Sequence, residues 1–165
     1  MKPGSTIFLQ AVLVLSAMVV LVLLIRFPLT EGRAENLDLF SIYLDPLILY
    51  GYAASIPFFI ALFKAFRLLG YIRQNKLFSP RSARTLKSIK YCAYWLSALI
   101  IGAGIYIRLF HARGDDPAGF IALCLLAAFI AVVVANMAAV FEKIVQQGTD
   151  IQSENESLKE QAGEG

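Results

Sequence analysis

Long apolar segments alternate with short charged segments along this chain, and four of the apolar segments approach the length of a membrane span. They are Thr6–Leu29, Pro46–Phe63, Tyr91–Ile107 and Gly119–Phe141, and only the first contains a charged residue, Arg26. A helix needs roughly 20 apolar residues to cross the hydrocarbon core of a bilayer. Helices are expected because lipid leaves the backbone groups of a strand edge unpaired, and the alternation typical of a membrane barrel is absent. The pattern therefore predicts an all-α integral membrane four-helix bundle.

The segment boundaries predict two parts of unequal size. Residues 1–148 form the membrane domain, with spans at about 6–29, 46–66, 88–110 and 119–144, and residues 149–165 form an acidic tail. The first apolar segment exceeds the 7–15 residues of a signal-peptide core. We therefore interpret it as an uncleaved span.

The predicted helices extend beyond the spans at one end. No helix breaker follows the second span before Gly70, so this helix is expected to continue out of the membrane. Ser79 and Pro80 suit a helix N-cap and first helical position, so the third helix is expected to begin before its span. Asp45 and Pro46 suit the start of the second helix in the same way.

The polar tail has two interpretations at this point. A heptad seam would be formed by residues three and four positions apart: Phe141, Ile144, Gly148, Ile151, Asn155 and Leu158. The alternative is a fraying helix followed by a disordered segment, because the repeat is short and contains a glycine. Both interpretations stay open on the sequence alone.

The distribution of charge predicts the orientation in the membrane. Residues 64–90 carry basic side chains and no acid, whereas the first loop, Glu31–Asp38, and the third loop, His111–Pro117, are each net negative. Lysine and arginine are retained in the cytoplasm during insertion. The central loop and both termini are therefore expected to be cytoplasmic.

The basic residues around the central loop are the main candidates for contact with lipid or a protein partner. They are Arg73, Lys76, Arg81, Arg84, Lys87 and Lys90. A basic residue near an anionic leaflet contributes about 1 kcal/mol to membrane attachment. Two other interpretations are that the charges only fix topology, or that they contact the acidic tail. Nucleic acid is not an expected partner, since no recognised binding motif accompanies the charge.

Two residues inside the spans are candidates for intramembrane packing. Pro57 removes a backbone donor in the second span, and Asn136 is the most polar residue of the fourth. Asn136 is expected to bond across helices. The alternative function is a small transporter or channel subunit, with a path around Pro57, Ser55, Ser97 and Asn136. The spans argue against it, because none has an ionisable residue at its centre.

The sequence contains few candidate catalytic residues. His111 is its only histidine, and no group of metal ligands accompanies it in the sequence. The chain has no phosphate-binding glycine loop, dinucleotide fingerprint or nucleophile elbow. We therefore expect a non-enzymatic protein with no catalytic residue, metal or cofactor, which acts through helix packing and through its basic loop and acidic tail.

Two segments carry a resemblance to a known family. One is Leu77-Phe78-Ser79-Pro80 followed by Leu86-Lys87-Ser88-Ile89, and the other is Val140-Phe141-Glu142 leading to Ile151-Gln152-Ser153-Glu154-Asn155-Glu156. Together they resemble the small bacterial membrane proteins of domain of unknown function 2975. The ending Glu154-Asn155-Glu156 departs from the family's Glu-Asn-Asp-like pattern. The resemblance implies four spans in a bacterial inner membrane, and it implies no activity. From the basic loop, the acidic tail and the small-residue helices we expect membrane lipids as partners, with either a second copy or another membrane protein.

Overall fold

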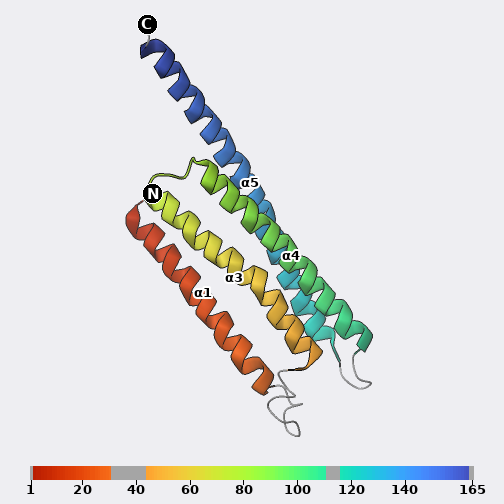
Figure 1. Ribbon diagram of the computed structural model, residues 1–165. Helices are drawn as coiled ribbons and strands as arrows, with labels where there is room; N and C mark the ends of the chain where they lie inside the picture. The colour runs from red at the N-terminus through yellow and green to blue at the C-terminus, as the bar shows by residue number, and fades with distance from the viewer. Residues whose placement is uncertain (1, 31–43, 111–115, 164–165) are drawn as a thin grey trace.

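The fold consists of four long helices, seen in a computed structural model that describes residues 2–30, 44–110 and 116–163 (Figure 1). The helices are α1 (Pro3–Thr30), α3 (Pro46–Arg73), α4 (Pro80–Phe110) and α5 (Ala118–Gly163). Each is long and apolar enough to cross a membrane, and the described residues contain no strand. The predicted all-α, four-span architecture is confirmed.

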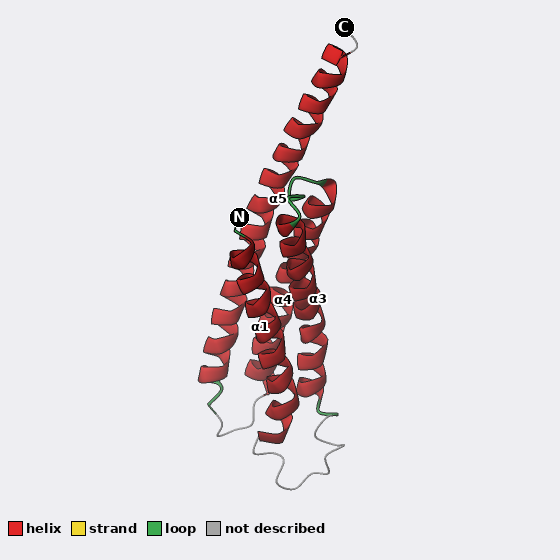
Figure 2. Cartoon of the chain, turned by 90° about the vertical axis from the view of Figure 1, so that its left-hand side faces the viewer, coloured by secondary structure: helices red, strands yellow, loops and turns green. Residues whose placement is uncertain are grey.

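The helices pack in the order α1, α3, α4 and α5. Helix α4 makes its most extensive contact with α5 and its next with α3, whereas α1 packs mainly on α3. The start of α1, the connection between α3 and α4 and the end of α5 all lie at the same end of the molecule (Figures 1 and 2). The end of α1, the start of α3, the end of α4 and the start of α5 lie at the opposite end (Figures 1 and 2).

Two helices begin where the sequence predicts. The side chain of Asp45 accepts a hydrogen bond from the backbone N–H of Leu47 at 2.9 Å, directly before α3. The hydroxyl of Ser79 accepts one from the backbone N–H of Ser82 at 3.3 Å, directly before α4. Helix α3 ends at Arg73, and Asn75 then takes a left-handed conformation with φ of 55°. Asparagine tolerates this conformation better than most residues, which explains the turn at this position.

Small residues line the contact between α4 and α5. The buried face of α5 is built from alanines spaced three and four residues apart: Ala128, Ala131, Ala135 and Ala138. Ala93 and Ser97 of α4 are buried there, and the Ser97 hydroxyl donates to the carbonyl of Ala128 at 3.2 Å. Small side chains let helix backbones approach closely where lipid provides no hydrophobic driving force.

The apolar cluster of the fold lies near the end that carries the basic residues. Ala83 and Leu86 of α4 pack with Val145 of α5, and Leu68 and Leu77 cover them. Val145 is only 2% exposed. These residues lie beyond or near the ends of the apolar segments, where the surroundings are water. Burial of their apolar side chains away from water therefore stabilises this part of the fold.

Helix α5 continues well beyond its apolar segment. It projects past the other helices, and every residue from 150 to 163 is exposed (Figure 2). A continuous helix is thus the observed form of the tail, in place of the disordered alternative. The residues of the predicted heptad seam are exposed apart from the half-buried Gly148, while Glu142 and Val145 are buried against the rest of the molecule.

Helix α1 is the least buried element. Only Thr6 and Pro28 are buried among its described side chains, and most of its large apolar side chains are exposed. A helix with this distribution suits contact with lipid on most of its surface.

Candidate functional site

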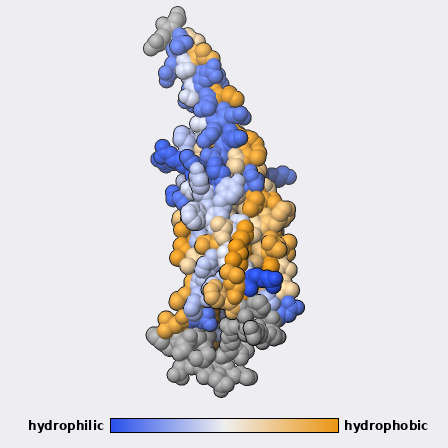
Figure 3. All heavy atoms as spheres, turned by 90° about the vertical axis from the view of Figure 1, so that its right-hand side faces the viewer, coloured by the Kyte–Doolittle hydropathy of each residue, from blue (hydrophilic) through white to orange (hydrophobic). Residues whose placement is uncertain are grey.

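Five of the predicted contact residues form one exposed surface, which we call the basic surface. It consists of Arg73, Lys76, Arg81, Arg84 and Lys87, from the last turn of α3, the following connection and the first turns of α4. Hydrophilic residues dominate the end with the projecting helix, and a largely hydrophobic band lies toward the middle of the molecule (Figure 3). The basic surface therefore lies next to the apolar region.

The sequence of α4 explains why its charges share a face. Arg81, Arg84 and Lys87 follow one another at steps of three residues, and all are exposed. Leu86 and Ile89 lie on the buried face of the same helix, at 5% and 8% exposed. The first turns of α4 are therefore amphipathic, with apolar and basic residues on separate faces.

Lys90, the sixth predicted contact residue, has a different environment. Its ammonium group lies 2.6 Å from a carboxylate oxygen of Glu142, so the pair joins α4 to α5. The side chains are 21% and 9% exposed. Lys90 is thus engaged within the molecule and does not share the free exposure of the basic surface. Sequence reasoning missed Glu142, although it continues the three-and-four spacing of the alanine face of α5.

A polar cleft of about 570 Å³ opens beside the basic surface. Lys76, Arg81 and Arg84 line it, together with Tyr71 and with Gln152 of the projecting helix. Guanidinium and ammonium groups donate strong hydrogen bonds to phosphate oxygens. The cleft therefore has the chemistry of an anion-binding site and the size of a lipid headgroup or larger.

A second, smaller cleft adjoins the first. It has a volume of about 300 Å³ and is lined by Arg84 and Lys87 on one side and by Glu142, Thr149 and Asp150 on the other. Within the described part of the chain, no ion pair joins the basic surface to the acids of the projecting helix. The five cations therefore keep their charge available to other molecules.

The polar residues inside the spans form hydrogen bonds with helices. Asn136 donates to the carbonyl of Val132 in its own helix at 2.9 Å and accepts from the hydroxyl of Tyr94 in α4 at 3.3 Å. The Ser55 hydroxyl donates within α3, at 2.6 Å to the carbonyl of Tyr52. Pro57 lies half-buried inside α3. These residues and Ser97 belong to three different helices.

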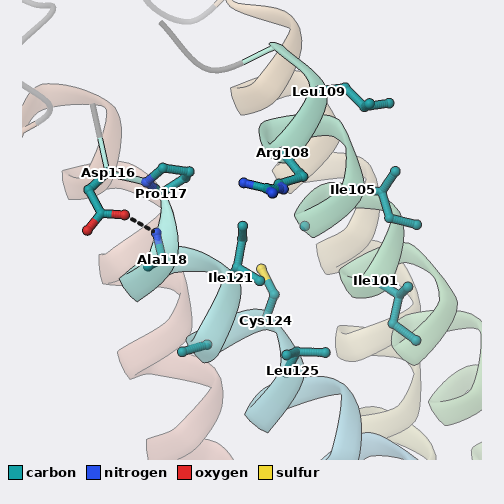
Figure 4. Close-up of a pocket in the computed structure, with 12 residues that line it drawn as sticks. Ile101, Ile105, Arg108, Leu109, Asp116, Pro117, Ala118, Ile121, Cys124 and Leu125 are labelled. Atoms are coloured by element: carbon teal, nitrogen blue, oxygen red, sulfur yellow. Dashed lines mark hydrogen bonds between the residues drawn. The ribbon is translucent and has the colours of Figure 1, made fainter. Parts of the chain in front are cut away.

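A cleft of about 600 Å³ lies between α4 and α5 at the opposite end of the molecule (Figure 4). Its lining is mostly apolar, with Arg108 and Asp116 as the charged residues. Asp116 accepts a hydrogen bond from the backbone N–H of Ala118 at 3.1 Å, which caps α5. His111 belongs to residues 111–115, which lie outside the described residues. Elsewhere in the described chain, no group of three His, Cys, Asp or Glu side chains could hold a metal ion.

Comparison with known proteins places the chain in a family. The profile of the family described as "Protein of unknown function (DUF2975)" matches residues 28–157. An "Uncharacterized membrane protein YoaS" of Bacillus subtilis (strain 168) is 41% identical over 159 residues, which cover 94% of this chain and 98% of the relative. No solved structure matches. The profile covers α3, α4 and most of α5, which are the helices that carry the basic surface and the Lys90–Glu142 pair. The chain is a four-helix membrane protein and belongs to the DUF2975 family.

Proposed function

We propose that this protein acts by contact rather than by catalysis, and that its basic surface binds anionic lipid headgroups at the cytoplasmic face of a bacterial inner membrane. The observation that supports the proposal is the exposure of five cations next to the apolar part of the molecule. Four of them, Lys76, Arg81, Arg84 and Lys87, border two clefts, and no acid of the described chain forms an ion pair with any of the five.

The proposed orientation places this end in the cytoplasm. The basic connection would stay there because lysine and arginine resist translocation, and both termini lie at the same end of the molecule. The cytoplasmic leaflet carries the anionic lipids that attract such residues. Five residues at about 1 kcal/mol each would give a substantial preference for anionic lipid, and salt would weaken it by screening.

The test measures which lipids copurify with the protein. The purified chain is exposed to mixed micelles of phosphatidylglycerol and phosphatidylcholine, and the retained lipids are quantified by mass spectrometry. We expect enrichment of phosphatidylglycerol, and a loss of that enrichment in a triple variant carrying Arg81→Gln, Arg84→Gln and Lys87→Gln. The matched control carries Lys143→Gln and Lys159→Gln, which remove exposed charge outside the basic surface. Equal enrichment in the triple variant would refute lipid recognition by this surface.

A protein partner is the second form of contact that the proposal includes. The projecting acidic helix and the basic surface lie at the same end of the molecule, so one partner could touch both. Crosslinking in native membranes followed by mass spectrometry would identify it. Deletion of residues 150–165 and charge reversal at Arg81 and Arg84 are each expected to weaken capture of such a partner. Unchanged capture in both variants would contradict this part of the proposal.

Transport is the alternative function, and its candidate residues are occupied with other contacts. Ser55 and Ser97 donate to helix carbonyls, and Asn136 bonds to its own helix and to Tyr94. A solute flux into liposomes that Asn136→Leu abolishes would favour transport over contact.

A further inference from the structure

The projecting part of α5 carries an apolar stripe that no other helix of the molecule covers. Ile144, Ile151 and Leu158 are 48%, 67% and 56% exposed. They are seven residues apart, so they lie along one line of the helix. Ile151 and Leu158 belong to a segment in which every residue is exposed, beyond the ends of the other helices (Figure 2). Contact with lipid therefore does not explain these two side chains.

The residues between them complete a heptad pattern. If Ile144, Ile151 and Leu158 take the d positions, the a positions fall on Gly148, Asn155 and Ala162. A single asparagine at an a position favours a two-stranded, in-register coiled coil, because its amide pairs with the same amide of the partner helix. Asn155 is the asparagine at an a position in this helix.

The charged residues that flank the stripe complement each other between parallel helices. In this register Glu154 takes a g position and Lys159 takes the following e position. In a parallel dimer each g residue faces the next e residue of the partner helix. Glu154 of each copy would therefore meet Lys159 of the other. Asp150, Glu156 and Glu160 take c, b and f positions, which face away from the partner.

We propose that α5 of two copies of this chain forms a parallel two-stranded coiled coil through residues 151–162. Two copies that insert with the same orientation necessarily direct their projecting helices to the same side, so the parallel arrangement needs no further constraint. The symmetric pairing satisfies both Glu154–Lys159 contacts at once.

The position of the stripe on α5 leaves room for a second helix. The buried face of α5 contains Glu142 and Val145, whereas the stripe lies toward the other side of the helix. Gly148 has no side chain, and the ring of Phe78 from the same chain occupies the space beside it. The close helix contact thus begins at Ile151, after the connection between α3 and α4 has been passed.

The first experiment is disulfide crosslinking of the full chain in membranes. The spans contain Cys92 and Cys124, so the background carries Cys92→Ala and Cys124→Ala. Leu158→Cys places a thiol on the stripe, and the matched control Glu160→Cys places one on the opposite side of the same exposed turn. We expect a covalent dimer from Leu158→Cys under mild oxidation, at a yield several-fold above that of Glu160→Cys. Equal yields, or no dimer from either variant, would overturn the proposal.

The second experiment tests the parallel register by exchanging charge. In the Leu158→Cys background, Glu154→Lys places two lysines opposite each other, and Lys159→Glu places two acids there. Each single change is expected to lower the dimer yield several-fold, and the double exchange is expected to restore it. An unchanged yield in both single variants would contradict the proposed register.

The inference rests on the proposed contact function only in naming a partner for the tail, and the two can fail separately. The triple variant of the basic surface keeps every residue of the stripe, so it is expected to crosslink as the unchanged chain does. In the chain with an intact basic surface, phosphatidylglycerol enrichment without a crosslinked dimer would overturn the coiled coil alone. In the chain with an intact basic surface, a dimer without phosphatidylglycerol enrichment would overturn lipid binding alone.

Discussion

At the scale of single residues, the Lys90–Glu142 pair is a charged contact between α4 and α5. It forms at 2.6 Å between two largely buried side chains, near the end of the apolar segments. A charge in such a place is costly when its partner is removed, because the remaining group stays desolvated without compensation. The pair therefore positions the two helices that border the smaller cleft.

Removal of either partner is expected to destabilise the fold. Glu142→Ala should lower the free energy of unfolding by about 3 kcal/mol, at the low end for buried pairs because Lys90 keeps some contact with solvent. The double variant Lys90→Met and Glu142→Met should recover most of the loss, since it leaves no unpaired charge. Unfolding in detergent with increasing dodecyl sulfate measures both. A double variant as unstable as the single one would show that the charges are not the cause.

Gly102 of α4 lies where an added side-chain atom would disturb the contact with α3. A Cβ atom at this position would lie 2.7 Å from the hydroxyl oxygen of Tyr50, which donates to the carbonyl of Leu99 at 2.6 Å. Gly102→Ala should therefore break this bond between α3 and α4 and cost about 1–2 kcal/mol.

The control for that substitution is another helical glycine. Gly51→Ala meets no atom within 4 Å and should stabilise α3 by about 0.5–1 kcal/mol. In a Tyr50→Phe background, Gly102→Ala should cost less than in the natural chain, because the hydrogen bond is already absent. Equal losses in both backgrounds, measured by the same unfolding assay, would exclude the proposed cause.

The sequence predicts helix starts better than it predicts these contacts. Asp45 and Ser79 were identified as caps because capping depends on residues only two or three positions away. The contact of Lys90 with Glu142, or of Tyr50 with Gly102, depends on how two helices are rotated and shifted against each other. Local patterns do not contain that information, so the basic surface was predicted as six residues and Lys90 was placed with the other five.

At the scale of elements, the connection between α3 and α4 is held against α5 by one aromatic ring. Phe78 lies against Gly148, in space that a side chain at that position would need. Leu77 packs beside it on the apolar cluster of Ala83, Leu86 and Val145. The connection therefore has a defined place, although it is short and polar.

A side chain at Gly148 should release this connection. Gly148→Ala is expected to displace Phe78 and to make residues 74–79 several-fold more sensitive to limited proteolysis in detergent. Gly163→Ala in the same helix meets no atom within 4 Å and should leave the cleavage rate unchanged. Cleavage at the natural rate in Gly148→Ala would show that Phe78 does not hold the connection.

The tail shows how far periodicity alone can describe an element. The spacing of Ile144, Ile151 and Leu158 was visible in the sequence, but Gly148 and the polar composition argued equally for a frayed end. The structure continues the helix of the fourth span to Gly163, because an already formed helix adds each further residue without a new nucleation step.

At the scale of the whole molecule, the ends of the chain and the basic connection share one side. The spans could be predicted because their length and lack of charge are properties of the segments themselves. The packing order of the helices could not, because all four are apolar enough to face lipid. The position of α4 between α3 and α5 follows from small residues such as Ala93 and Ser97, whose role appears only with their neighbours in place.

Labelling of single thiols tests the proposed orientation. In the background without native cysteines, Ser5→Cys and Ser157→Cys lie at exposed positions near the two ends of the chain. Both should react with a membrane-impermeant maleimide in inside-out vesicles and stay unlabelled in intact cells. Labelling of either variant from outside intact cells would contradict the cytoplasmic placement of that end.

The weak attachment of α1 has a consequence for biosynthesis. This helix leaves the ribosome before α3, the helix against which it mainly packs, has been made. Because α1 satisfies its own backbone hydrogen bonds and exposes apolar side chains around most of its surface, it is stable in the bilayer without a protein neighbour. Assembly of this protein can thus begin with a freely diffusing helix, and α3, α4 and α5 can join each other before α1 docks at their edge.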